Sequence, residues 1–137
     1  MSFSTEFLDD GRGVRFVGRG RLTGQEILEA KAGLLRSPDR LKTLTYALVD
    51  VTDIDALSIS REHVLEFVVV DVQIAAVAGR PVAVAIVAPS DLAFGIACMW
   101  EAFVELTGWR THVFRSRAEA EPWLRPFIEG REPPAAR

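Results

Sequence analysis

The chain is poor in the residues that most often build disulfides and metal sites. Its one cysteine, Cys98, excludes a disulfide within the chain and is typical of a reducing compartment. The two histidines, His63 and His112, are far apart in the sequence, and together with a single cysteine they argue against a zinc site. We therefore expect neither a bound metal nor any other cofactor.

An excess of basic residues is also missing. The net charge is -3 at pH 7, whereas proteins that bind nucleic acid usually present a concentrated basic face. Four arginines cluster near the N-terminus, but Asp9 and Asp10 dilute their charge. These arginines are Arg12, Arg15, Arg19 and Arg21. The composition therefore predicts no nucleic-acid partner.

Long hydrophobic runs are absent too. The apolar stretches are too short and too interrupted to span a bilayer, so we expect any association with a membrane to be peripheral. The N-terminal sequence "MSFSTEFLDD" has no basic segment followed by an apolar one, which argues against a signal peptide. Together with the single cysteine, these features predict a cytoplasmic protein.

What the sequence does contain is the composition of one globular domain. The chain has 137 residues, of which 49% are hydrophobic and 26% are charged, and these values are usual for a soluble domain. We expect a single domain over residues 1–130. The remaining segment, "REPPAAR" at residues 131–137, is predicted to be a disordered tail.

Two kinds of apolar segment predict the strands. Short alternating segments at residues 2–8 and 14–18 flank "DDGRG", whose turn-forming residues indicate a hairpin. "TYALVDV" and "VAVAIVA" are continuously apolar, as parallel strands covered on both faces are, and "THVF" is a shorter third member. Helical segments separate these strands, so the order β, β, α, β, α, β, α, β, α predicts an α/β fold.

Polar residues at fixed spacing mark the starts of helices. Thr23 with Glu26, and Ser116 with Glu119, have the spacing of a capping box. Pro122 lies deep in the last predicted helix, where a proline removes a backbone hydrogen bond and collides with the preceding turn. We therefore expect a kink or a break at Pro122.

The segment "EFVVVDVQIAAVAG", residues 66–79, is among the most apolar in the chain, yet Asp71 lies in its middle. Ser60 as a cap and Gly79 as a stop predict a helix, on which Asp71 falls on the apolar face, opposite a narrow polar stripe. A helix that is apolar over so much of its circumference needs cover on more than one side. Either the sheet and a neighbouring helix supply it, with an arginine or a backbone amide satisfying Asp71, or the extra face meets a second copy or an apolar ligand.

The helix that follows "VAVAIVAPSD" has two apolar strips. We expect the first strip to face inward, and it comprises Leu92, Ile96, Met99, Phe103 and Leu106. The second strip, beside it, comprises Ala93, Ala97, Trp100 and Val104. Residues on this helix and on the helix before it form the predicted ligand or partner surface. Its members are Phe67, Val68, Asp71, Val72, Phe94, Cys98, Trp100 and Val104.

Two stretches of the chain resemble a known family. "YALVDVTDID" and "VAIVAPSDLAFGIACMW…VFRSRAEAEPWL" are similar to the SpoIIAA-like group within the STAS-type fold, small bacterial proteins mostly without an assigned activity. The similarity extends over residues 44–124. It implies a mixed β-sheet of four to five strands, in which an N-terminal hairpin is followed by parallel strands, with about four helices.

The same resemblance implies a site of phosphorylation. STAS regulators carry a serine in the loop after the central strand, and a partner kinase modifies it. The matching loop here reads "DIDALSIS", without a glycine after the serine, and Ser58 is the nearest candidate. Relatives often have an arginine where this chain has Cys98. The fold is also similar to that of CRAL-TRIO-type lipid carriers, an analogy that implies an apolar ligand.

Signals for catalysis are weak. Asp50, Asp53 and Asp55 follow a parallel strand, where open α/β sheets place their sites, but turn and cap roles explain them better than magnesium binding does. Cys98 has acidic helical neighbours, whereas a reactive thiolate needs an electropositive setting, and a catalytic Asp71 has no identifiable partner. We therefore expect a non-enzymatic binding or regulatory domain that forms a homodimer through apolar helix faces. The alternatives are a carrier or sensor of an apolar small molecule or membrane lipid, and a phospho-switched regulator.

Overall fold

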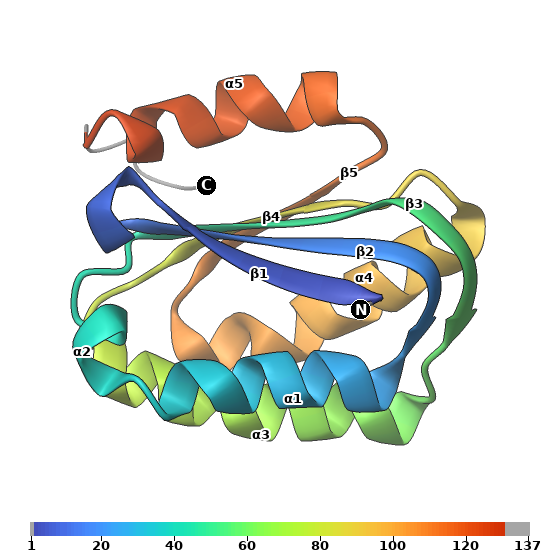
Figure 1. Ribbon diagram of the computed structural model, residues 1–137, viewed down its shortest axis with the longest axis horizontal. Helices are drawn as coiled ribbons and strands as arrows, with labels where there is room; N and C mark the ends of the chain where they lie inside the picture. The colour runs from blue at the N-terminus through green and yellow to red at the C-terminus, as the bar shows by residue number, and fades with distance from the viewer. Residues whose placement is uncertain (1, 131–137) are drawn as a thin grey trace.

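The structure is a five-stranded sheet with helices on both faces (Figure 1). The computed structural model describes residues 2–130, and the predicted disordered tail at residues 131–137 lies outside them. The strands are β1 (Phe3–Leu8), β2 (Gly13–Thr23), β3 (Tyr46–Ser58), β4 (Ala83–Val87) and β5 (Arg110–Phe114). The helices are α1 (Gly24–Leu35), α2 (Pro38–Leu41), α3 (Arg61–Ala78), α4 (Asp91–Val104) and α5 (Arg117–Ile128), with 3-10 turns η1 (Asp9–Gly11) and η2 (Glu105–Thr107). The described range thus holds one helix more than expected, the four-residue α2.

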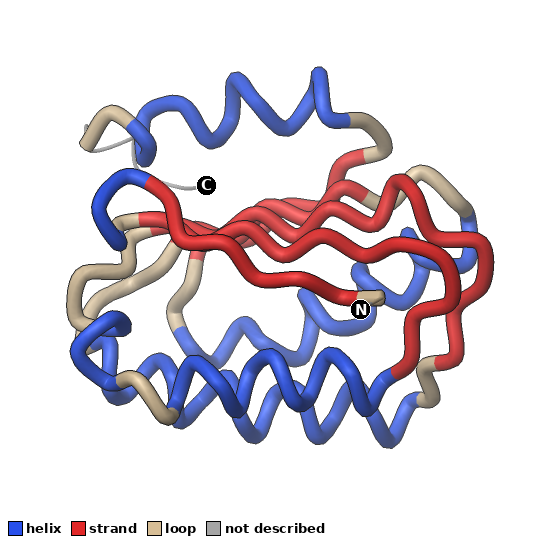
Figure 2. Tube along the Cα trace, in the orientation of Figure 1, coloured by secondary structure: helices blue, strands red, loops and turns tan. Residues whose placement is uncertain are grey.

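The strands lie in the sheet in the order of the chain, β1-β2-β3-β4-β5 (Figure 2). β1 pairs antiparallel with β2, as the predicted hairpin requires, and the other neighbouring pairs are parallel. Because each parallel strand is added on the same side of the one before it, right-handed crossovers place α1, α3 and α4 on one face. α5 covers the opposite face (Figure 1). The predicted mixed α/β architecture is confirmed.

β2 and β3 are longer than their neighbours and extend past the end of β4. β3 has 13 residues and β4 has 5, and β4 pairs with the first part of β3 alone. The register between β2 and β3 shifts at Val17/Arg19 and again at Gly20/Arg21, where Gly20 has a φ of 64°. Such irregularities bend a pair of strands. The extension accordingly curves toward the starts of α1 and α3 (Figure 1) and closes one end of the space beneath the sheet.

The larger hydrophobic core lies between the sheet and the layer of α1, α3 and α4. Phe16, Phe67 and Trp100 are buried in it. A smaller core lies under α5, where Ala120 and Leu124 are buried against the sheet. The ring contacts that accompany α5 join His112, Phe114, Trp123 and Phe127. The sheet therefore separates two cores of different size.

The helix starts confirm one predicted capping box and half of the other. The amide of Glu26 donates to Thr23 Oγ1 at 3.2 Å, and the amide of Thr23 donates to the Glu26 carboxylate at 3.0 Å. The amide of Glu119 likewise donates to Ser116 Oγ at 3.3 Å. However, the Glu119 carboxylate accepts from the amide of Arg115 instead of that of Ser116. Its reciprocal bond therefore lies one residue outside the cap.

We expected a kink or a break at Pro122, and the structure shows no break there. α5 continues from Arg117 to Ile128 through both Pro122 and Pro126. Pro122 is on the exposed side of the helix, whereas Ala120 and Leu124 are buried on the side that faces the sheet. A carbonyl that lacks its helical donor on the exposed side can be hydrated, so the proline costs less there than in a buried turn.

Candidate functional site

Asp71 is the centre of a polar cluster inside the helix layer. α3 turns it toward the core, where 1% of its surface is exposed. Its Oδ1 accepts a hydrogen bond from Lys31 Nζ of α1, and its Oδ2 accepts one from Trp100 Nε1 of α4, each at 2.7 Å. A buried carboxylate is costly unless it is paired and hydrogen-bonded, and here both oxygens have partners. This one side chain therefore links three helices.

Lys31 is the member of the cluster that sequence reasoning missed. We expected an arginine or a backbone amide beside Asp71, whereas the structure supplies a lysine and an indole N–H. The Lys31 ammonium also lies 5.7 Å from the centre of the Phe67 ring and 5.5 Å from that of Trp100, positions that favour a cation. A lysine within the otherwise apolar segment 30–35 was the signal available in the sequence.

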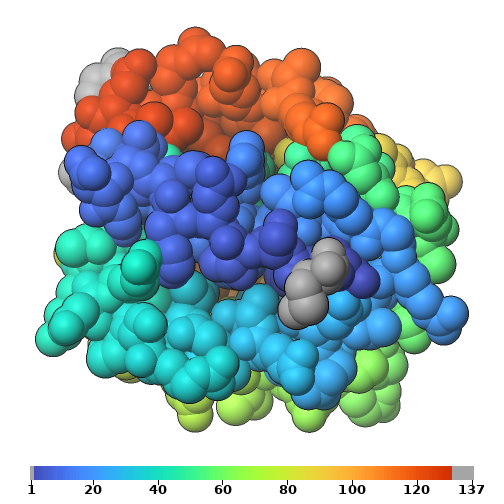
Figure 3. Space-filling model, viewed as in Figure 1, coloured from blue at the N-terminus to red at the C-terminus, as the bar shows by residue number. Residues whose placement is uncertain are grey.

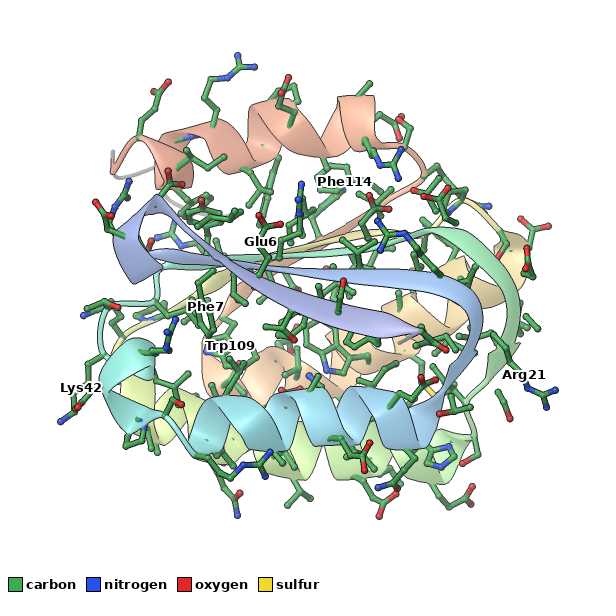
Figure 4. The ribbon with its side chains drawn as sticks, viewed as in Figure 1. Glu6, Phe7, Arg21, Lys42, Trp109 and Phe114 are labelled. Atoms are coloured by element: carbon green, nitrogen blue, oxygen red, sulfur yellow. The ribbon has the colours of Figure 1, made fainter. Side chains whose placement is uncertain are left out.

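A cavity of about 130 Å³ lies beside this cluster, between the sheet and the helices. Its wall is apolar apart from Asp71, Lys31 and two indole rings, and Leu22 and Leu57 of the curved strand extension line one part of it. The Nε1 of Trp109 is buried without a hydrogen-bond partner among the described residues. Figure 4 shows this side chain between the sheet and the helix layer. A buried, unpaired N–H costs about 1–3 kcal/mol, so this donor requires an explanation.

The predicted ligand or partner surface is mostly interior. Phe67, Asp71 and Trp100 line the cavity. Val68 and Val104 are buried in the same core without lining the cavity. In the folded chain these residues therefore do not form an exposed partner surface. A charged residue at Val68 or Trp100 would disturb the core before it could report on an interface.

The other three predicted residues lie nearer to the surface. Val72 is 39% exposed. Phe94 is partly buried, and the guanidinium of Arg115 lies 4.1 Å from the centre of its ring. Cys98 is a free thiol that is partly buried. Val72 is thus the one predicted surface residue that solvent reaches freely.

The prediction for the two apolar strips of α4 is partly wrong: Ile96, Met99 and Phe103 of the first strip are partly buried against the core, but its two ends are exposed. Ala93, Ala97 and Trp100, from the strip expected at the side, are buried. Leu92 and Leu106, from the strip expected to face inward, are 60% and 70% exposed. Small alanines allow a helix to lie close to a neighbouring element, and the same strip brings Trp100 to the polar cluster. The prediction followed side-chain size, whereas the structure turns the strip that carries Trp100 most fully inward.

The exposed large apolar side chains lie on α3, on α4 and on the adjoining η2. Within residues 2–130 these are Leu65, Val69, Val72, Leu92 and Leu106. On α3, Leu65, Val69, Val72 and the exposed Ala76 are spaced by four, three and four residues, so they form one row, here named the outer stripe. α3 runs along the lower margin of the molecule below α1 (Figure 3). Contiguous exposed apolar surface of this kind is typical of an interaction site.

A second buried aspartate, Asp50, lies on β3 on the side of α5. Its Oδ1 accepts from the amide and the hydroxyl of Thr52, and its Oδ2 accepts from Arg117 Nε at 2.5 Å. Burial raises the pKa of Asp50, but the hydrogen bonds from Thr52 and Arg117 outweigh it, so the pKa lies below its usual value. Arg117 also contacts Asp53 at 3.2 Å. Within the part of the chain that the structure describes, no three His, Cys, Asp or Glu residues are grouped to hold a metal ion.

Ser58, the candidate phosphorylation site, is the last residue of β3 and is exposed. Nearby, Ser60 caps α3: the His63 amide donates to Ser60 Oγ at 3.1 Å, and the Ser60 amide donates to His63 Nδ1 at 3.0 Å. This reciprocal bonding is a capping box in which histidine takes the usual place of glutamate. Helix capping therefore accounts for the Ser60–His63 pair, and phosphorylation of Ser58 stays a prediction.

Comparisons with known proteins bear on the fold. No family model and no curated protein matches the chain. Among solved structures it is similar to an uncharacterized protein of the DUF3478 family with a SpoIIAA-like fold from Shewanella loihica PV-4. The two share 24% identity over 89% of this chain and 91% of that chain, with a TM-score of 0.50. None of the helices in residues 2–130 is long and apolar enough to cross a membrane. The strand order and this likeness together show that the chain has the SpoIIAA-like fold predicted from its sequence.

Proposed function

We propose that this SpoIIAA-like domain acts by binding rather than by catalysis, and that its partner is a second copy of the chain. The placement of the exposed large apolar side chains carries the proposal. All five of those in residues 2–130 lie on α3, α4 or the adjoining η2. α3 and α4 are neighbours in the helix layer, so these side chains belong to one side of the molecule.

The outer stripe is suited to an antiparallel copy of itself. A twofold axis between Val69 and Val72 sets Val69 against the partner's Val72. The same axis sets the large Leu65 against the partner's Ala76, which is small. The spacing of four, three and four residues is the spacing by which paired helices interlock. The stripe is therefore complementary in size to itself, as a twofold interface requires.

The ends of α3 and its length refine the proposal. The same axis sets Arg61 opposite the partner's Arg80. In each copy the Arg80 guanidinium donates to the carbonyls of Lys42 and Leu44, so we expect no ion pair at the ends of the paired helices. α3 has 18 residues, which corresponds to a length of about 27 Å. With α4 alongside, the surface offers about 500–600 Å² per copy, less than the roughly 800 Å² of a standard interface. We therefore expect a reversible dimer with a dissociation constant in the micromolar range.

A charge in the middle of the outer stripe tests this dimer. Val69 is 61% exposed, so Val69→Glu should leave the fold intact while it places two carboxylates near the twofold axis. Sedimentation equilibrium over a series of concentrations should show a monomer–dimer equilibrium for the wild type and a shift to monomer for the variant. Ala118→Glu is the matched control, because it adds the same charge at an exposed position of α5, on the opposite face.

Two results would contradict the proposal. One is a wild-type chain that sediments as a monomer throughout the micromolar range. The other is a dimer that Val69→Glu leaves as stable as Ala118→Glu does, since that dimer must use another surface.

A further inference from the structure

The first strand, β1, lies at the edge of the sheet, and within residues 2–130 no element covers its outer side. In Figure 1 this free edge faces the viewer, between α5 above and α1 below, and Figure 3 shows its side chains in dark blue on the surface. Edge strands are usually protected from pairing with another chain by proline, lysine or a bulge. β1 contains neither proline nor lysine, and its register with β2 is unbroken from Phe3 to Leu8. This edge is therefore open to another strand.

The hydrogen bonds between β1 and β2 decide which backbone groups point outward. The amide of Arg19 donates to the carbonyl of Ser2 at 2.7 Å, so this pair is bonded across the two strands. Bonded and non-bonded positions alternate in an antiparallel pair, so the next residues of β1 that bond to β2 are Ser4, Glu6 and Leu8. The residues between them turn their N–H and C=O groups away from the sheet, and these are Phe3, Thr5 and Phe7.

The side chains of β1 give its two faces different chemistry. Phe3 and Phe7 face the core under the helix layer, and the Phe3 ring stacks on that of Phe16 with 5.5 Å between their centres. Glu6 lies on the other face, where its carboxylate pairs with Arg15 at 2.5 Å. Figure 4 shows Glu6 and Phe7 on opposite sides of the strand. A strand that pairs with β1 therefore meets an aromatic face and a polar face.

The sequence of β1 is nearly symmetric about Thr5, since residues 3–7 read "FSTEF". A second copy placed antiparallel, with a twofold axis at Thr5, sets Phe3 opposite the partner's Phe7 and Thr5 opposite its own equivalent. These are the outward-pointing positions, so their N–H and C=O groups all find partners. The same axis sets Ser4 opposite the partner's Glu6, whose carboxylate can accept from the serine hydroxyl. β1 is therefore complementary to itself in both backbone and side chains.

We infer that β1 pairs with β1 of a second copy, so that the two sheets join into one continuous sheet. The inference does not rest on the outer stripe, which lies on α3 and leaves β1 free. Each strand has six residues, so the contact is smaller than a standard interface and we expect a dissociation constant of about 0.1–1 mM. The outer stripe then forms dimers first, and β1 joins dimers into larger assemblies at higher concentration.

Amide hydrogen exchange tests the pairing directly. The full chain with Val69→Glu is compared at about 10 µM and about 1 mM, because this substitution removes association through the outer stripe. At the higher concentration the outward amides of Phe3, Thr5 and Phe7 should exchange about two- to five-fold more slowly. The amides of Ser4 and Glu6 are bonded to β2 at both concentrations, so they are internal controls and should not change. The inference is wrong if the outward amides exchange at the same rate at both concentrations.

A proline at the axis tests the same contact by substitution. Thr5→Pro should abolish the association seen at about 1 mM, because it removes an outward donor and leaves every bond from β1 to β2 in place. Thr5→Val keeps the amide and should keep the association. Sedimentation equilibrium in the Val69→Glu background measures both. Association that persists in Thr5→Pro must use another surface and would overturn the inference.

Charges at Ser4 give a test with two opposite signs. Ser4 is exposed, so Ser4→Glu should leave the fold intact while it sets a carboxylate opposite the partner's Glu6 in two symmetric pairs. Association should weaken about two- to thirty-fold, whereas Ser4→Lys should strengthen it. Ala118→Glu and Ala118→Lys change the net charge equally on the exposed side of α5 and should have far smaller effects. Equal responses at the two positions would contradict the pairing.

Discussion

Two aspartates are buried within residues 2–130, and they lie on opposite faces of the sheet. Asp71 is enclosed by the helix layer beside the cavity, and its partner Lys31 has 18% of its side chain exposed. Asp50 lies under the start of α5, and its partner Arg117 has 57% of its side chain exposed. Burial of the carboxylate is similar in the two pairs, but water screens the pair at Asp50 far more than the pair at Asp71. The surroundings of the cation therefore decide how much each ion pair contributes to the stability of the fold.

Removal of the enclosed carboxylate is the strongest way to test this difference. Asp71→Ala leaves the buried Trp100 N–H without its acceptor and the partly buried Lys31 ammonium without its counter-ion. Loss of one partner of a buried ion pair costs about 3–5 kcal/mol, and we expect the free energy of unfolding to fall by that amount. Urea denaturation of the variant and the wild type at neutral pH measures it.

A double variant identifies the cause. Asp71→Leu combined with Lys31→Met removes both charges and keeps side chains of similar size. Because apolar replacements of a buried pair are often neutral, most of the stability lost in Asp71→Ala should return. If the double variant is as unstable as Asp71→Ala, the unpaired charge is not the reason for the loss.

The packing on the two faces can be compared with one substitution made twice. Ala97 lines the cavity under the helix layer, and Ala120 is 2% exposed in the core under α5. Ala97→Leu should raise the free energy of unfolding by about 0.5–2 kcal/mol, because it fills empty space. Ala120→Leu should lower it by about 1–3 kcal/mol, because it crowds a packed site. Urea unfolding curves that shift in the same direction for both variants would contradict the comparison.

The smallest effect is expected at Asp50, and it depends on pH. The pKa of Asp50 lies below its usual value in the folded chain, so its stabilising effect is complete above about pH 4–5 and is lost as the pH falls through the lowered pKa. Asp50→Asn should cost about 1 kcal/mol at neutral pH, since the exposed Arg117 weakens the pair. Urea unfolding at neutral pH and at about pH 3 should show the gap to the wild type closing in acid. A gap that stays constant would mean that the ionised carboxylate is not its source.

Much of the fold was predictable because it depends on residues that are close in the sequence. The hairpin followed from turn residues between alternating segments, and α3 followed from a cap at Ser60 and a stop at Gly79. Predictions failed where a distant element decided the outcome. The inward strip of α4 was partly misassigned because side-chain size does not decide which strip the structure turns most fully inward, and Pro122 was tolerated because α5 exposes it.

The candidate sites divide in the same way. The sequence by itself determined the order of the elements and the inward position of Asp71, because helical periodicity and capping act over a few residues. The tertiary structure decided that Lys31 and Trp100 are its partners, that a cavity remains beside them, and that the N–H of Trp109 is unpaired. These features depend on how segments far apart in the chain pack against one another, and that packing is set by side-chain shape across helices and sheet rather than by any local pattern.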